Sequence, residues 1–161
     1  MLLNAPPVPR LVAAANQLCL LTSPAQRSSM RGDLAGLLSD LAAVGFERLD
    51  AALMANVGDG DPMPARMDAI GQGYVAFAKA NPALFLLMFR SERLDFGRPA
   101  LREAAGAAFG VLSGAIGERR QEAMEAKLTL PQAAGIAASW SLVHGFAMLL
   151  LDGRLKGLLT S

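Results

Sequence analysis

Hydrophobic residues recur along this chain at helical spacing. Between about Gly32 and Asn56, leucine or phenylalanine returns every three or four residues, while acidic and basic residues fall mostly on other faces. This spacing predicts a long amphipathic helix. Its apolar positions are Leu34, Leu37, Leu38, Leu41, Phe46, Leu49 and Leu53. The following segment, GDGDPMP at 58–64, predicts a loop because glycine, proline and aspartate favour turns.

Four more helices are predicted after that loop. They cover residues 64–80, 83–89, 99–126 and 131–151. Asn81-Pro82 supplies an N-cap residue and a proline at the first helical position of the second of these helices. Gly153 is placed to end the last one as its C′ residue. No segment shows the alternation of a strand, so the pattern predicts an all-α fold with about five helices after residue 30.

The last predicted helix carries no charged side chain. From Pro131 to Leu151 the sequence reads PQAAGIAASWSLVHGFAMLLL. A run of this length either spans a membrane or is buried on nearly all sides. Four polar side chains lie within it, and the other helices carry ordinary charges, which favours burial in a cytoplasmic protein without membrane contact. A membrane-associated helical protein is the less favoured alternative.

Two stripes of small residues mark the last two long helices. On the helix at 99–126 the stripe consists of Gly106, Gly110, Gly114 and Gly117. On the uncharged helix it consists of Ala134, Ala138, Ser141 and Gly145. Each helical glycine costs about 0.8–1 kcal/mol relative to alanine, so close packing against another backbone must offset the cost. We therefore expect an isologous homodimer in which these two helices of each copy form a four-helix bundle.

Composition narrows the possible functions. The chain has 161 residues, enough for one domain with a real core, and its net charge of +1 gives no general attraction to nucleic acid. A single cysteine, Cys19, and a single histidine, His144, exclude an intramolecular disulfide and the usual zinc sites. No nucleophile–base pair, carboxylate dyad or phosphate-binding loop is visible. The sequence therefore predicts a protein that is not an enzyme and has no catalytic residue, metal ligand or cofactor.

Three segments together resemble one family. Trp140-Ser-Leu-Val-His144-Gly145 is similar to the Trp…His-Gly (WHG) signature of one subclass of TetR-type transcriptional regulators. Tyr74-Val-Ala-Phe77-Ala78 with Asn81-Pro82-Ala83-Leu84-Phe85 resembles the central motif of that subclass, and Gly45-Phe46-Glu47-Arg48-Leu49 resembles its linking helix. The resemblance covers about residues 31–155 and concerns the C-terminal domain of these regulators. It implies an all-helical dimer whose last two helices form the interface.

The resemblance also implies a pocket for an apolar or aromatic effector. The residues expected around it are Phe46, Met54, Tyr74, Phe77, Phe85, Met88, Phe89, Phe109, Trp140 and His144. Aromatic residues at helical spacing are equally typical of an ordinary core. For Trp140 and His144, a core pair whose imidazole bonds to a neighbour is favoured over a ligand contact.

The first 30 residues are predicted to be a separate N-terminal segment with at most one short helix, at 11–21. The helical domain then occupies 31–161. TetR-type regulators begin with three helices that contain a helix-turn-helix, and three helices need roughly 45 residues. No such motif is recognisable here, and the basic residues of this region are only Arg10, Arg27 and Arg31. We therefore expect DNA to be a partner only where a helix-turn-helix is supplied.

The favoured hypothesis is an effector-binding and dimerisation domain of a TetR-like regulator, which controls transcription in response to an apolar small molecule. A stand-alone small-molecule-binding protein, or a dominant-negative partner of a full-length regulator, is the alternative.

Overall fold

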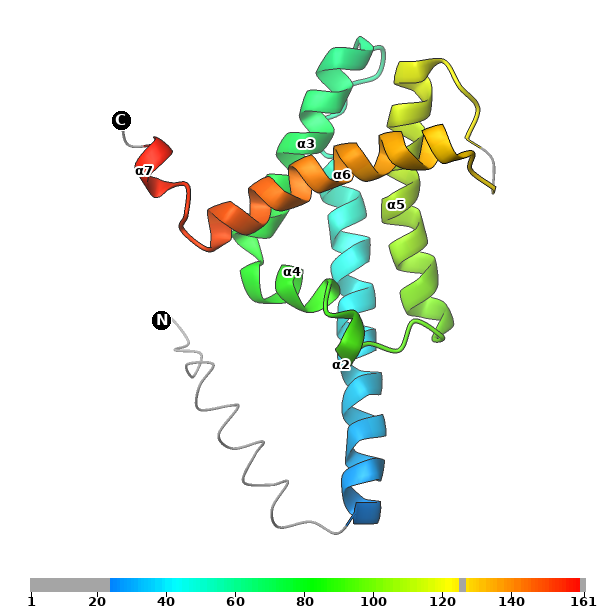
Figure 1. Ribbon diagram of the computed structural model, residues 1–161, viewed down its shortest axis with the longest axis vertical. Helices are drawn as coiled ribbons and strands as arrows, with labels where there is room; N and C mark the ends of the chain where they lie inside the picture. The colour runs from blue at the N-terminus through cyan, green and yellow to red at the C-terminus, as the bar shows by residue number, and fades with distance from the viewer. Residues whose placement is uncertain (1–23, 125–126, 160–161) are drawn as a thin grey trace.

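The computed structural model describes residues 24–124 and 127–159, with side chains described between Leu34 and Gly157. The described residues contain only helices and loops, which confirms the predicted all-α fold (Figure 1). The elements are α2 (Pro24–Met54), α3 (Met63–Ala80), α4 (Pro82–Met88), the 3-10 turn η1 (Ser91–Arg93), α5 (Pro99–Arg120), α6 (Leu130–Leu151) and α7 (Lys156–Leu159). The helix predicted at 11–21 lies outside the described residues.

Helix α2 forms the central axis of the domain. In Figure 1, α3 and α5 flank the upper part of α2, and α6 crosses over them. The core lies where these helices meet. Its largest buried side chains are Phe46, Leu49 and Leu53 of α2, Ile70, Tyr74 and Phe77 of α3, Phe85 and Met88 of α4, and Leu101 of α5. The lower part of α2 extends beyond this core.

A glycine permits the close contact between α2 and α3. A Cβ atom built on Gly73 would collide with the carbonyl oxygen of Ala52 and would lie 3.1 Å from the Cα of Leu53. The two backbones can touch only because residue 73 has no side chain. Gly71 lies two residues earlier on the same helix, and a Cβ there would meet no atom within 4 Å.

The apolar face of α2 differs from the predicted one in its first half. Leu34, Leu37 and Leu41 are exposed, Leu37 to 66%. The buried positions in this part of α2 are Ser39, Ala42 and Ala43, because α5 and the segment that precedes it pack on that side. Helix α2 also begins at Pro24 instead of near Gly32, so it runs without interruption across the predicted domain boundary at residue 30.

The predicted ends of the last two long helices are partly correct. Helix α5 ends at Arg120, six residues before the predicted end, because Gln121 adopts a left-handed conformation with φ of 57°. The N–H of Glu122 then donates to the carbonyl of Gly117 at 2.9 Å, which closes the helix as in a Schellman motif. At the end of α6, Gly153 has φ of 71° and plays the predicted C′ role.

Polar contacts attach the segment before α5 to α2. Ser39 is fully buried, and its Oγ accepts a hydrogen bond from the backbone N–H of Asp95 at 2.9 Å. The guanidinium of Arg98 donates to Oδ1 of Asp40 at 2.8 Å. We call these two contacts the Ser39–Asp40 clamp. They fix the position of the η1–α5 connection relative to α2.

Candidate binding cavity

A large apolar cavity lies between α6 and the layer formed by α2, α3 and α5. Its volume is about 1170 Å³, which is above the usual range for small-molecule sites. Every long helix contributes to its wall. The principal apolar lining residues are Phe46, Leu49, Leu53, Met67, Ile70, Met88, Phe89, Phe109, Leu112, Trp140, Val143 and Phe146. We refer to this space as the α6 cavity.

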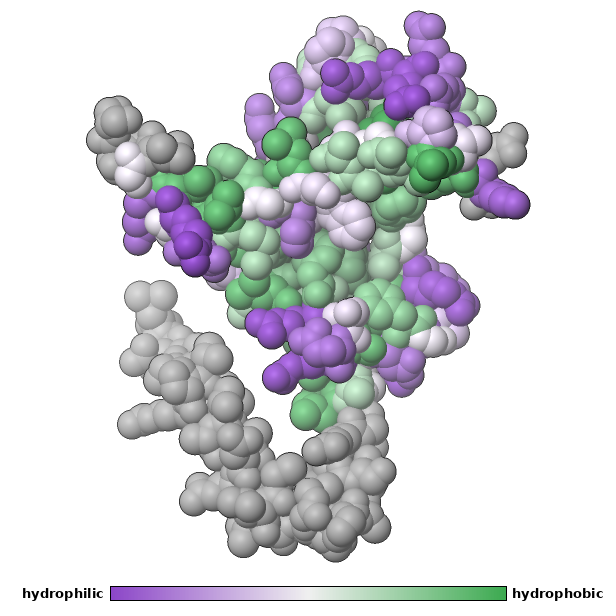
Figure 2. Space-filling view, in the orientation of Figure 1, coloured by the Kyte–Doolittle hydropathy of each residue, from purple (hydrophilic) through white to green (hydrophobic). Residues whose placement is uncertain are grey.

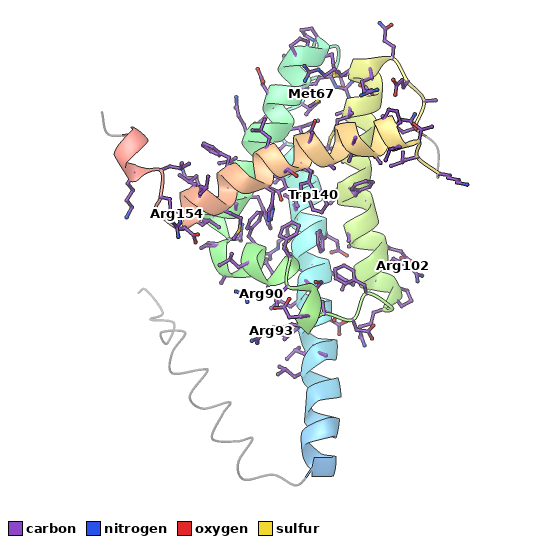
Figure 3. All side chains as sticks on the ribbon, in the orientation of Figure 1. Met67, Arg90, Arg93, Arg102, Trp140 and Arg154 are labelled. Carbon is purple, nitrogen blue, oxygen red and sulfur yellow. The ribbon has the colours of Figure 1, made fainter. Side chains whose placement is uncertain are left out.

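Several apolar side chains of the cavity wall are exposed to solvent. They are Phe96 (40%), Phe109 (41%), Trp140 (38%), Leu142 (78%) and Phe146 (43%). Figure 2 shows apolar surface along α6 and below it, with charged residues arranged around this region. In Figure 3, Trp140 lies just below α6 and Arg102 lies lower on α5.

The structure brings six of the ten expected pocket residues to the cavity wall. They are Phe46, Tyr74, Met88, Phe89, Phe109 and Trp140. The other four are Met54, Phe77, Phe85 and His144, which do not line it. Phe77 and Phe85 are buried in the core, and Met54 is exposed at the end of α2. Leu49 and Leu53 also line the cavity, although they were not among the predicted pocket residues. Both follow Phe46 at helical spacing, and that spacing is the signal that could have identified them.

His144 joins α3 to α6 beside the cavity. Its Nδ1 lies 2.8 Å from the hydroxyl oxygen of Tyr74, 70 positions away in the chain. The ring centroid of His144 is 4.5 Å from that of Phe89 and 5.4 Å from that of Phe85. The structure therefore favours the interpretation of His144 as a residue that bonds to a neighbour, whereas Trp140 borders the cavity.

Burial keeps both members of this pair neutral at ordinary pH. It raises the pKa of Tyr74 to about 12, with the Trp140 side chain acting in the opposite direction, and it lowers the pKa of His144. With its proton on Nε2, the neutral imidazole accepts the Tyr74 O–H at Nδ1. The hydrogen bond between Tyr74 and His144 thus forms without a charge on either side chain.

Alkaline pH is expected to destabilise the protein through Tyr74. Its pKa is near 10 in the unfolded chain and about 12 in the folded one, so its contribution to stability is complete below pH 10 and is lost as the pH rises to 12. Two pKa units correspond to about 3 kcal/mol. Because Tyr74 is the only tyrosine, the ultraviolet absorbance of phenolate reports its titration directly. A native-state midpoint near pH 10 would contradict this prediction, and urea unfolding of Tyr74→Phe supplies the stability control.

The two stripes of small residues face open space. A Cβ atom on Gly106, Gly110, Gly114 or Gly145 would meet no described atom within 4 Å, and Ala134, Ala138 and Ser141 are exposed. Gly117 is different, because its own chain covers it with Met124 and the carbonyl of Glu122. Large apolar side chains beside the stripe of α6 are also exposed, Leu142 to 78%. Within the described chain, no atom packs against Gly110, Gly114 or Gly145, whereas Gly106 also lines the α6 cavity.

The described residues contain no group of three or more histidine, cysteine, aspartate or glutamate side chains that could hold a metal ion. Among the described helices, only α6 is long and apolar enough to cross a membrane. Length and composition alone are weak grounds for a membrane span. The expectation that this helix is buried on nearly all sides is not met within the single chain, because only 11% of its apolar stretch is buried and Ile136 and Ala147 are its only buried residues.

Comparison with known proteins connects this geometry to a family. A family model described as the C-terminal domain of tetracycline repressor-like proteins matches residues 67–161. A solved structure of a protein of unknown function from Rhodococcus sp. RHA1 is similar to the chain, with 28% identity and a TM-score of 0.61. That similarity covers 75% of this chain and 63% of the Rhodococcus chain, so the match extends over less than two thirds of the solved protein. No curated protein matches the chain significantly.

Proposed function

Because the chain belongs to the family of tetracycline repressor-like C-terminal domains, we propose that it is the effector-binding and dimerisation domain of a cytoplasmic TetR-like transcriptional regulator. Its α6 cavity would hold an apolar or aromatic small molecule, and α5 and α6 would pair with a second copy. The α6 cavity carries the proposal, because its largely apolar and aromatic wall suits a ligand of that kind. Assignment to the WHG subclass stays a prediction.

The cavity offers a direct route from ligand to α2. Phe46, Leu49 and Leu53 form part of its wall, and all three belong to that helix. A ligand that packs against them would favour one position of α2 over another, which is a shift of population between two arrangements. In a regulator that carries a helix-turn-helix, α2 would pass this change to the DNA-reading part. DNA is proposed as a partner only through such a motif.

An uncovered dimerisation face would also allow pairing with a related full-length regulator. The exposed stripes on α5 and α6 support this second possibility, in which the chain acts as a dominant-negative partner. Mixing with a full-length relative would then yield heterodimers.

Filling the cavity is expected to abolish ligand binding without unfolding the protein. Ala105 is half-buried on α5 and lines the cavity, so Ala105→Trp would place an indole in the ligand volume. We expect at least a ten-fold loss of affinity for the neutral fluorescent probe N-phenyl-1-naphthylamine, since the volume it needs is occupied. Titration of the probe measures the dissociation constant, and far-ultraviolet circular dichroism checks the fold.

The matched control is Ala51→Trp, which changes an exposed alanine of α2 that does not line the cavity. Its affinity should equal that of the unchanged protein. Equal affinity of both variants, or no probe binding by the unchanged protein, would refute the cavity as the effector site.

A further inference from the structure

Part of the wall of the α6 cavity consists of large apolar side chains that the single chain leaves in contact with solvent. Phe109 of α5 and Leu142 and Phe146 of α6 all line the cavity, and all three are exposed. A pocket for a small molecule usually encloses most of the surface of its ligand. A ligand that packs against these three side chains would remain partly in water, so the wall that one chain supplies is incomplete.

The exposed part of the wall adjoins both stripes of small residues. On α6, three wall residues directly follow three stripe residues: Ser139 follows Ala138, Leu142 follows Ser141, and Phe146 follows Gly145. On α5, Phe109 directly precedes Gly110, and Gly106 belongs to both the stripe and the wall. Neighbouring residues of a helix point about 100° apart. On both helices, therefore, the cavity wall begins at the edge of the stripe.

A second copy that packs on the stripes would extend over this part of the wall. A Cβ atom on Gly110 or Gly145 would meet no described atom within 4 Å, so there is room for a helix to approach. A helix with its side chains is about 10–12 Å wide, which is wider than a stripe of single residues. Its flanks would contact the residues one position away, and these include Phe109, Leu142 and Phe146.

The surface formed by α5 and α6 suits a copy of the same chain as its partner. Residues 104–117 of α5 and residues 130–151 of α6 contain no charged side chain. Figure 2 shows apolar surface along α6, and only 11% of the apolar stretch of this helix is buried within the single chain. A two-fold axis brings identical patches together, and charged patches would place like charges opposite each other. An uncharged patch can meet its own copy without that repulsion.

We infer that the second copy completes the wall of the α6 cavity, so that effector binding and dimerisation strengthen each other. This inference rests on the proposed function and adds a form of regulation to it. A ligand that contacts both subunits binds the dimer more tightly than the monomer, and it stabilises the dimer in return. The concentration of the protein then influences how strongly it responds to its effector.

A ten-fold preference for the dimer requires little contact with the partner. It corresponds to about 55 Å² of apolar ligand surface removed from water, at about 25 cal/mol per Å². With one ligand in each subunit, ten-fold tighter binding at both sites strengthens the dimer about a hundred-fold.

Dilution of the unchanged protein tests the inference without any substitution. Analytical ultracentrifugation gives the dissociation constant of the dimer, and fluorescence gives the affinity for N-phenyl-1-naphthylamine above and below that concentration. We expect the monomer to bind the dye about ten-fold more weakly than the dimer does. Saturating dye should lower the dissociation constant of the dimer about a hundred-fold.

A variant that blocks pairing provides the monomer at high protein concentration. Ala138 lies in the stripe of α6 and does not line the cavity. Ala138→Arg should therefore lose about ten-fold in dye affinity through loss of the partner, while far-ultraviolet circular dichroism shows an unchanged fold. Ala51→Arg is the matched control, because it adds the same charge at an exposed position of α2. It should keep both the dimer and the dye affinity.

Equal or tighter binding of the dye by the monomer would overturn the inference, while the proposed function would stand, since the cavity would still hold its ligand. An unchanged protein that stays monomeric with and without dye would overturn the inference and remove dimerisation from the proposed function. If the dye does not bind at all, the inference fails together with the proposed effector site.

Discussion

Replacing Gly73 with alanine is expected to lower the free energy of unfolding by about 3 kcal/mol, at the upper end of the usual cost of overpacking. The added Cβ would collide with the Ala52 carbonyl oxygen and approach the carbonyl carbon of Ala52 to 3.0 Å. These atoms are backbone, so no side-chain rotation can relieve the contact. Helices α2 and α3 would have to separate, which would loosen the packing of the core that contains Leu53 of α2 and Phe77 of α3.

Gly71→Ala is the matched control for this prediction. It makes the same chemical change two residues away, where a Cβ meets no atom within 4 Å. Alanine is favoured over glycine inside a helix, so this variant should gain about 0.5–1 kcal/mol. Urea unfolding of the two variants and the unchanged protein measures both effects. Similar stabilities for the two variants would show that α2 and α3 are not in the close contact described.

Placing an arginine at Ala138 is expected to raise the dissociation constant of the proposed dimer at least a hundred-fold. Ala138 lies in the small-residue stripe of α6 between Ala134 and Ser141, all of them exposed in the single chain. A second copy could approach this stripe closely only while its side chains remain small. An arginine would hold the helices apart and would bury an unpaired charge, a cost of several kcal/mol.

Light scattering at micromolar concentration measures the effect on assembly. The unchanged protein should be a dimer and Ala138→Arg a monomer. Ala51→Arg introduces the same charge at an exposed alanine of α2 outside the stripes, and it should stay dimeric. A monomeric unchanged protein would remove dimerisation from the proposed function.

Local signals in the sequence predicted the helices well. Pro82, Pro99 and Gly153 mark helix ends through backbone chemistry that depends on one residue, and each lies where it was expected. Asn81 occupies the predicted N-cap position of α4, but its side chain makes no cap hydrogen bond and donates instead to the carbonyl of Phe77 in α3. Gln121 gave no such signal, because a left-handed residue other than glycine has no reliable mark in a sequence. The last turns predicted for α5 were therefore wrong.

Helical spacing alone could not predict which residues form the cavity, because that depends on how the helices cross one another. Tyr74 and Phe77 lie on one side of α3, yet only Tyr74 reaches the cavity wall, while Phe77 is buried in the core. The contact between Tyr74 and His144 joins positions 70 apart and depends on how α6 crosses α3. Similarly, Leu34, Leu37 and Leu41 fit a helical stripe as well as Phe46 does, but the packed side of α2 changes along its length.

The Ser39–Asp40 clamp gives α2 the properties of a lever. The clamp holds α2 where it leaves the core, and the helix continues for fifteen residues from Pro24 to Leu38 beyond it. That arm is about 22 Å long at 1.5 Å per residue. A tilt of only about 5° about the clamp would displace its far end by about 2 Å. A change at the cavity wall on α2 too small to alter the core could thus become a displacement that a neighbouring domain would register.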